Sequence, residues 1–244
     1  MSLLSGIFPP VCAGCGEEFS GIPGTLCPAC LAKLHVFDHH FRCPGCGGEN
    51  LSPAALCAEC SQEPPRPWKN ALALFAYCSY GKKLIRKLKF GNAVGLARPL
   101  GSMAAELFRN SGYHADVIVP IPLTPLRIIS RTYNQSDLIA KVVSENCGIP
   151  RAALLKRKFS LRHQAFLNRK QRHSGLKDVF KLNPFCREPV LGKSILLIDD
   201  VLTTGATLSA AAGVLIDAGA ADICIMVIAR SVSPAIFGPE NFFH

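Results

Sequence analysis

The residues with the clearest chemical potential lie together in the stretch Ser194–Thr207. Four apolar residues, Ile195–Ile198, predict a buried strand, and two consecutive carboxylates, Asp199 and Asp200, follow at once. We expect them where the strand ends, at the carboxyl edge where open α/β sheets bind ligands. The next loop is rich in hydroxyl groups and glycine and leads into a predicted helix, so it offers backbone N–H groups to a phosphate. Since carboxylates accept hydrogen bonds from ribose hydroxyls, the stretch predicts a ribose phosphate site. The alternative is an ordinary strand–turn–helix with capping acids and threonines.

A second group of chemistry-bearing residues consists of four C-x-x-C pairs within the first 60 residues. Two such pairs can complete the tetrahedral shell of one zinc ion, and a shell of four thiolates is typical of a structural site. The sequence therefore predicts two structural zinc sites. Pairing of C-x-x-C knuckles that are neighbours in the sequence closes the shorter chain loops and is preferred. An interleaved pairing is an alternative that the sequence leaves open. The alternative is a redox pair of the thioredoxin type. The predicted zinc ligands are Cys12, Cys15, Cys27, Cys30, Cys43, Cys46, Cys57 and Cys60.

The expected cellular location of the protein is inferred from the same cysteines and from the hydropathy of the chain. The segment Met1–Val11 lacks the basic flank and the cleavage site of a signal peptide, which favours metal binding over disulfides. No apolar run approaches the roughly 20 residues that span a bilayer. We therefore expect a cytoplasmic protein without a membrane span.

The formal net charge of +10 is concentrated in two blocks of the chain. Residues 67–100 carry seven basic and no acidic side chains, and residues 151–181 carry ten basic and one acidic side chain. Such blocks are typical of proteins that bind a phosphate-rich ligand or a nucleic acid. A solvated basic surface is the simpler alternative. The candidate nucleic-acid contacts are Arg157, Lys158, Arg162, Arg169, Lys170 and Arg172.

The composition divides the chain into a cysteine-rich module, residues 1–66, and an α/β domain, residues 67–244. The proline-rich stretch Glu63–Pro67 is the natural linker between them. Alternating strand and helix patterns after it predict a mostly parallel sheet with flanking helices. Strands are expected near Ala71–Tyr80, Asp116–Ile121, Ser194–Asp199 and Asp222–Ala229, and helices near Gly81–Phe90, Ala97–Arg109, Gln135–Cys147 and Ala206–Ala218.

The motif Ser194–Thr207 is the signature of type I phosphoribosyltransferases, and the α/β domain resembles that family. The resemblance implies that Asp199 and Asp200 bind the ribose 2′- and 3′-hydroxyls of phosphoribosyl pyrophosphate, with Mg²⁺ on the diphosphate. The 5′-phosphate would be enclosed by Thr203, Thr204, Gly205, Ala206 and Thr207.

A further element, Pro120-Ile121-Pro122, resembles the family's pyrophosphate loop, whose strained backbone turns its amides toward the leaving group. Arg127 and Arg131 follow four residues apart and could clamp a diphosphate. Arg131 is therefore grouped with Asp199 and Asp200 as a catalytic candidate. Ordinary surface arginines are the alternative for this pair.

The whole chain, from Ile7 to Arg230, resembles the ComF competence-protein family, which includes GntX-like members. The resemblance rests on the cysteine knuckles, the segment Lys87–Phe90 with Lys89 as a candidate ligand-binding residue, and the Asn134-Gln135 turn. It implies a role in DNA uptake, with single-stranded DNA and a helicase-like partner. Two further hypotheses stay open: a genuine phosphoribosyltransferase, and a sensor that binds the ligand without turnover. In the family of type I enzymes, a loop placed like Arg157–Arg172 closes over the substrate.

Overall fold

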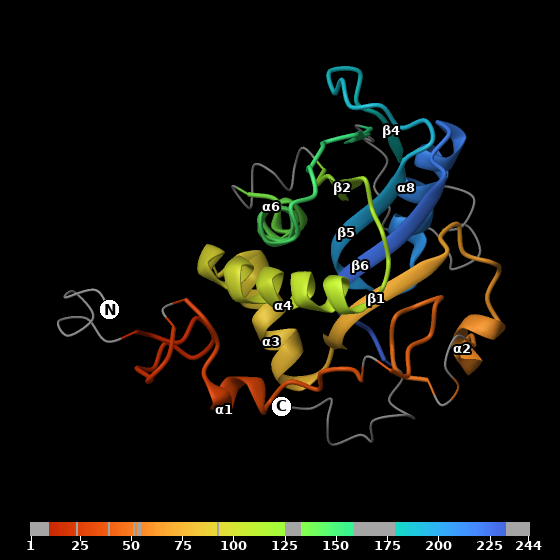
Figure 1. Ribbon diagram of the computed structural model, residues 1–244. Helices are drawn as coiled ribbons and strands as arrows, with labels where there is room; N and C mark the ends of the chain where they lie inside the picture. Colours follow the sequence, from red (N-terminus) through yellow and green to blue (C-terminus); the bar gives the residue numbers. More distant parts are fainter. Residues whose placement is uncertain are drawn as a thin grey trace, which may run out of the picture.

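The computed structural model describes residues 10–22, 24–38, 40–50, 52, 55–91, 93–124, 133–158 and 179–232. Its centre is a four-stranded sheet in the order β1-β6-β5-β2, in which all neighbouring strands are parallel (Figure 1). The strands are β1 (Asn70–Ala76), β2 (Val117–Pro120), β5 (Ser194–Leu202) and β6 (Asp222–Arg230). They are almost entirely buried, as expected for a parallel sheet covered on both faces. The predicted fold class is thus confirmed.

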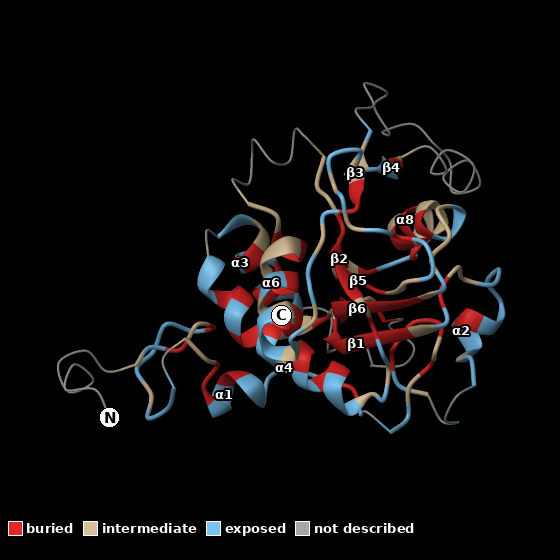
Figure 2. Ribbon diagram, turned by 45° about the horizontal axis from the view of Figure 1, so that its top comes forward, coloured by how far each residue is buried: buried red, intermediate tan, exposed pale blue. Residues whose placement is uncertain are grey.

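The helices divide between the two faces of the sheet (Figure 2). Leu72, Leu196 and Met226 belong to one buried cluster, and their sequence neighbours Ala73, Leu197 and Val227 belong to the other, because side chains alternate along a strand. The first face is covered by α3 (Ser79–Phe90), the short 3-10 turn η2 (Val94–Leu96), α4 (Ala97–Asn110) and α6 (Gln135–Cys147). The second face is covered by α8 (Ala206–Asp217).

Three differences from the predicted elements concern the strands. The strand expected over Ala71–Tyr80 ends at Ala76, because the chain turns there and α3 already begins at Ser79. The strand that carries the acidic pair continues to Leu202 instead of ending at Asp199. An antiparallel pair, β3 (Leu155–Arg157) with β4 (Phe180–Leu182), was not expected, because three-residue strands carry no readable periodicity.

The cysteine-rich segment wraps around the free edge of β1. Val36 forms an antiparallel bridge with Phe75, and the N–H of Phe37 donates to the carbonyl of Leu74 at 3.1 Å. The chain before this bridge, with α1 (Pro28–Leu31), packs on the first face of the sheet, and the chain after it, with α2 (Ala58–Ser61), packs on the second. The edge of β1 is thereby covered, and the two cysteine groups lie on opposite sides of the sheet (Figure 2).

Both cysteine groups therefore belong to the buried cores of the sheet. Cys12, Cys27 and Cys30 join one core, and Cys43 and Cys46 join the other. A boundary between independent domains near residue 66 stays a prediction. In the part of the chain that the structure describes, no helix is long and apolar enough to cross a membrane.

Candidate functional site

The acidic pair lies at the carboxyl edge of the sheet, beside the end of its shorter neighbour. β2 ends at Pro120, which is paired with Ile198, whereas β5 continues past Asp199 and Asp200 alongside β6. The helix that follows β2 in the chain, α6, covers the first face, and α8 after β5 covers the second. Connections that diverge to opposite faces leave a crevice at the carboxyl ends of the strands, where α/β sheets bind ligands.

Asp199 is partly buried and is held by the beginning of α6. The hydroxyl of Ser136 donates to Asp199 Oδ1 at 2.9 Å, and the backbone N–H of Asp200 donates to the same oxygen at 2.9 Å. Burial and the negative charge of Asp200 nevertheless raise the pKa of Asp199 to about 7, against the opposing effect of these donors and of Lys89. A carboxyl group whose pKa is raised by burial and a neighbouring charge is a candidate for a functional site.

Asp200 is buried and forms an ion pair with α3. Lys89 Nζ lies 2.9 Å from Asp200 Oδ1, and the lysine side chain is only 19% exposed. The predicted ligand-binding residue Lys89 is thus brought to the acidic pair from a position more than 100 residues away in the sequence. The chain that leads into α6 is also attached to α3, because the hydroxyl of Tyr133 donates to the carbonyl of Leu88 at 2.6 Å.

The loop after the acidic pair has the form expected of a phosphate-binding loop. Thr203 and Thr204 are exposed, and Gly205 adopts the left-handed conformation, with φ +81°, at the beginning of α8. The N-cap residue, Gly205, has no side chain to cap the helix, and the hydroxyl of Thr204 accepts from the N–H of Ala206 at a long 3.4 Å. The N–H groups at this end of the helix and the positive end of the helix dipole are therefore suited to an anion. Ala206 and Thr207 are the first two residues of the helix and are partly buried.

The predicted pyrophosphate loop is only partly arranged for a ligand. The N–H of Ile121 donates to the carbonyl of Ile198 at 2.9 Å, so this amide extends the pairing with β5 and does not face a ligand. The carbonyl of Ile121 accepts from Asn134 Nδ2 at 3.0 Å, which ties the loop to the start of α6. Pro120 ends β2 and Pro122 follows, partly buried. Arg127 and Arg131 lie outside the described residues.

The eight predicted zinc ligands form two groups, Cys12, Cys15, Cys27 and Cys30, and Cys43, Cys46, Cys57 and Cys60, each with its four sulfur atoms within 4.8 Å of one another. The sequential pairing of the knuckles is thereby confirmed.

Zinc fits both groups of sulfur atoms. A tetrahedron with zinc–sulfur bonds of about 2.3 Å has edges of about 3.8 Å. The Cys12–Cys30, Cys15–Cys27 and Cys46–Cys57 sulfur pairs lie 3.7, 3.9 and 3.8 Å apart. Burial opposes the ionisation of Cys12, but the backbone N–H groups of Cys27, Cys15 and Gly14 lower the pKa of its thiol to about 6. Burial raises the pKa of Cys30 in the same group to about 12, so the spacing of the sulfur atoms is what supports a metal site here.

The first cysteine group, which consists of Cys12, Cys15, Cys27 and Cys30, contacts α3 directly. The hydroxyl of Tyr80 donates to Cys30 Sγ at 2.9 Å, and Lys87 Nζ donates to the carbonyl of Gly14 at 2.7 Å. Lys89 lies on the same helix, so the helix that positions the first cysteine group also positions the cation beside Asp200.

The predicted nucleic-acid contacts are described only at the beginning of their segment. Arg157 lies over the ring of Phe180 at 5.3 Å, and the N–H of Lys158 donates to the carbonyl of Val179 at 2.8 Å. The other four, Arg162, Arg169, Lys170 and Arg172, lie outside the described residues. The other basic block is well described, and α3 exposes Lys82, Lys83, Arg86 and Lys87.

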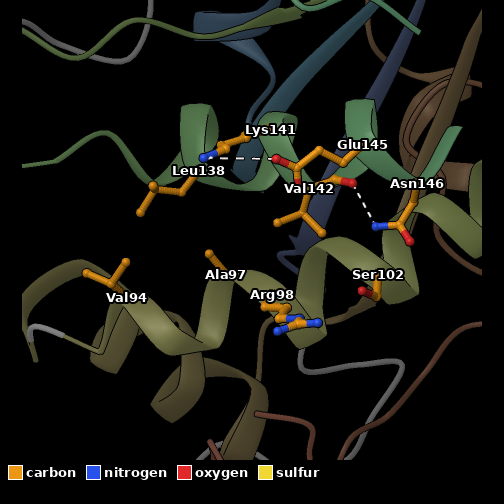
Figure 3. Close-up of a pocket in the computed structure, with 9 residues that line it drawn as sticks. All are labelled: Val94, Ala97, Arg98, Ser102, Leu138, Lys141, Val142, Glu145 and Asn146. Carbon is orange, nitrogen blue, oxygen red and sulfur yellow. Dashed lines mark hydrogen bonds and ion pairs between the residues drawn. The ribbon is translucent and has the colours of Figure 1, made fainter. Parts of the chain in front are cut away.

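A cavity of about 600 Å³ between α4 and α6 lies apart from this site (Figure 3). Its described lining includes Arg98, Lys141 and Glu145 but none of the predicted site residues. This hollow is therefore not the ligand site proposed from the sequence.

Three polar residues near the site were missed by the sequence analysis. Ser136 bonds Asp199, and Gln135 is fully buried with no hydrogen-bond partner for its amide among the described residues. Arg66, from the linker, lies against Gly205. The first two follow the Asn134 N-cap, and that position could have suggested them; Arg66 gave no signal in the sequence.

Comparisons with known proteins agree with this geometry. Residues 3–61 match the double zinc ribbon domain, and residues 93–235 match the phosphoribosyl transferase domain. The fold and the cysteine groups thus define a phosphoribosyl transferase domain combined with a double zinc ribbon.

Three relatives are similar over most of their length. DNA utilization protein YhgH of Salmonella typhimurium is 31% identical, over 92% of this chain and 98% of the relative. Competence protein F of Haemophilus influenzae is 27% identical, over 90% and 96%, and competence protein ComFC of Bacillus subtilis is 28% identical, over 93% and 97%. The chain belongs to the ComF family of phosphoribosyl transferase domain proteins.

Proposed function

We propose that the protein binds phosphoribosyl pyrophosphate at the carboxyl edge of the sheet. The observation that carries the proposal is the adjacency of the Asp199–Asp200 pair and the N-terminal end of α8, whose N-cap residue is Gly205. The two carboxylates accept hydrogen bonds from the ribose hydroxyls, and the loop Thr203–Thr207 donates to the 5′-phosphate. Lys89 forms an ion pair with Asp200 in the ligand-free protein, and it is close enough to contribute positive charge to the ligand site.

Magnesium belongs to the same proposal as the counter-ion of the diphosphate, whose charge it neutralises. The chain's own residues orient the ribose and the phosphate, and Arg131 with Arg127 binds the leaving diphosphate. Loss of pyrophosphate from C1 of the ribose requires no covalent nucleophile on the protein. Pyrophosphate release measured with candidate acceptors therefore distinguishes a transferase from a protein that only binds.

Asp200→Asn tests the ligand assignment. It should weaken binding of phosphoribosyl pyrophosphate with Mg²⁺ by about 10- to 100-fold, because hydrogen bonds to a charged group contribute about 1.5–3 kcal/mol. Isothermal titration calorimetry measures the affinity. Asp217→Asn is the matched control, since it removes an exposed carboxylate at the other end of α8. Equal affinities of Asp200→Asn and the wild type, or no binding by the wild type, would refute the assignment.

We further propose that the protein acts in DNA uptake and contacts single-stranded DNA through its basic surface. The relatives named for DNA utilization and competence support this role. So does α3, which exposes four basic side chains and ends in Phe90, whose side chain is 70% exposed. Basic residues next to an exposed aromatic ring suit a single strand with unstacked bases. Tyr80 and Tyr133, also considered for stacking, use their hydroxyls within the fold.

Charge reversal distinguishes this DNA surface from a merely solvated one. Lys83→Glu combined with Arg86→Glu should weaken single-strand binding about tenfold or more and make its dependence on salt shallower, because each lost phosphate contact removes released counter-ions. Arg169→Glu with Arg172→Glu should have the same effect through the other basic block. Fluorescence anisotropy at several salt concentrations measures both. Lys141→Glu, on exposed α6 surface, is the control. An affinity that does not change with salt would exclude the proposal.

A helicase-like partner for this activity and a cytoplasmic location belong to the same proposal. They rest on the family resemblance, and co-purification of the tagged chain with such a partner tests the first of them.

A further inference from the structure

The linker residue Arg66 lies against the loop that is proposed to hold the 5′-phosphate. A Cβ atom added to Gly205 would overlap Arg66 Nη1, and it would also meet Trp68 at 3.3 Å. Arg66 belongs to the chain before β1, whereas Gly205 follows β5, so only the tertiary fold brings them together. The absence of a side chain at residue 205 is what leaves room for the guanidinium.

The position of Arg66 is fixed by the second cysteine group. Trp68 is buried, and its Nε1 donates to the carbonyl of Gly45, between Cys43 and Cys46, at 3.0 Å. The guanidinium of Arg66 lies over the Trp68 ring at 5.3 Å. Such stacking holds an arginine in a defined direction and does not use its N–H groups.

Those N–H groups are not satisfied within the described protein. Arg66 Nε and Nη1 are shielded from solvent and have no hydrogen-bond partner among the described residues. Buried donors without a partner are costly, and the cost is greater for a charged group. The guanidinium also lies at the positive end of α8, where a second positive charge is unfavourable unless an anion accompanies it.

We propose that Arg66 is a ligand-binding residue for the phosphate monoester, supplied by the linker and held in place by the second zinc site. This inference rests on the proposed binding of phosphoribosyl pyrophosphate and adds a residue to that site. A phosphate at the start of α8 would bind the helix end, and a small rotation of the guanidinium would turn its shielded Nε and Nη1 groups toward the same anion. The second cysteine group would then affect phosphate affinity, although it lies outside the α/β pattern of the sequence.

The test compares ribose 5-phosphate, inorganic pyrophosphate and phosphoribosyl pyrophosphate, because Arg66 is assigned to the 5′-phosphate end of phosphoribosyl pyrophosphate. Arg66→Ala should weaken binding of ribose 5-phosphate and of phosphoribosyl pyrophosphate about 10- to 100-fold and leave inorganic pyrophosphate binding unchanged. Arg66→Lys keeps the charge but loses the planar donors, so we expect an intermediate loss. Lys69→Ala is the matched control, since Lys69 is an exposed basic residue of the same segment. Calorimetry on the full chain gives the affinities, and metal analysis gives the zinc content.

The outcomes separate this inference from the function on which it rests. If the wild type binds phosphoribosyl pyrophosphate and Arg66→Ala and Arg66→Lys bind it equally well, Arg66 is not a ligand and the proposed function stands. If Arg66→Lys, with full zinc content, loses pyrophosphate as strongly as ribose 5-phosphate, the assignment to the phosphate end is wrong. If the wild type binds none of the three ligands, the proposed function itself fails.

Discussion

Replacing Cys46 with serine should destabilise the whole sheet and not only the cysteine-rich segment. Cys46 is buried in the core that β1, β5 and β6 share with α8. A structural zinc ion contributes about 10–16 kcal/mol in small zinc peptides, which is as large as the total stability of about 5–15 kcal/mol of a typical domain. The loss of one zinc should therefore lower the midpoint of thermal unfolding by more than about 10 °C.

The single tryptophan makes this prediction easy to measure. Trp68 bonds Gly45 beside the second cysteine group, so its fluorescence reports that region, and far-UV circular dichroism reports the sheet and helices. Both signals should change at the same temperature in Cys46→Ser. Cys186→Ser, which removes a partly buried cysteine outside both groups, should keep both zinc ions and the wild-type midpoint. A variant that loses one zinc while its circular dichroism melts as in the wild type would show an independent module ending near residue 66.

Asp199→Asn should stabilise the ligand-free protein above pH 7 while abolishing most ligand binding. The folded-state pKa of Asp199 is raised to about 7, whereas an unfolded aspartate has a pKa of about 3.9. The stability associated with the neutral form is complete below about pH 4 and is lost as the pH rises through 7. Asparagine avoids this loss. Because Asp199 keeps some exposure, we expect a gain of about 2 kcal/mol at pH 8, less than the full shift implies.

Denaturant unfolding at pH 5 and pH 8 measures this difference. The stabilisation by Asp199→Asn should be larger at pH 8 than at pH 5, and affinity for phosphoribosyl pyrophosphate in the wild type should rise as Asp199 ionises. Ser136→Ala removes the hydroxyl that donates to Asp199, so it should move both transitions to higher pH. A stability difference that does not change with pH would contradict the raised pKa. Opposite effects on stability and binding are typical of functional residues.

The two partly buried cations, Lys89 and Arg66, follow a common arrangement around the proposed site. Lys89 approaches Asp200 from α3, which also contacts the first cysteine group through Tyr80 and Lys87. Arg66 approaches Gly205 from the linker, which contacts the second cysteine group through Trp68. Each cysteine group thus supports one of the two cations beside the proposed ligand site. The double zinc ribbon is in this sense part of the binding site's framework.

The sequence by itself determined the elements and the chemistry that depend on local pattern. Four apolar residues before Asp199 required a buried strand, and the glycine and hydroxyl residues after Asp200 required a loop at a helix start. The spacing of the C-x-x-C pairs likewise predicted two four-cysteine groups, because each knuckle is a local turn, but it left the pairing of the knuckles to the structure. Local geometry is encoded within a few residues, and it could therefore be predicted.

The tertiary structure alone decided which distant residues meet. Nothing in the neighbourhood of Lys89, Arg66 or Ser136 indicates its partner, since each contact depends on how a helix or linker packs against the sheet. The crossing of the chain over the β1 edge at Val36, which places the two cysteine groups on opposite faces, depends on strand pairing between distant segments. The length of β5 beyond Asp199 depends on β6 beside it. Such non-local pairing carries no periodic signal, and it brings two cations, Lys89 and Arg66, to the motif that the sequence predicts.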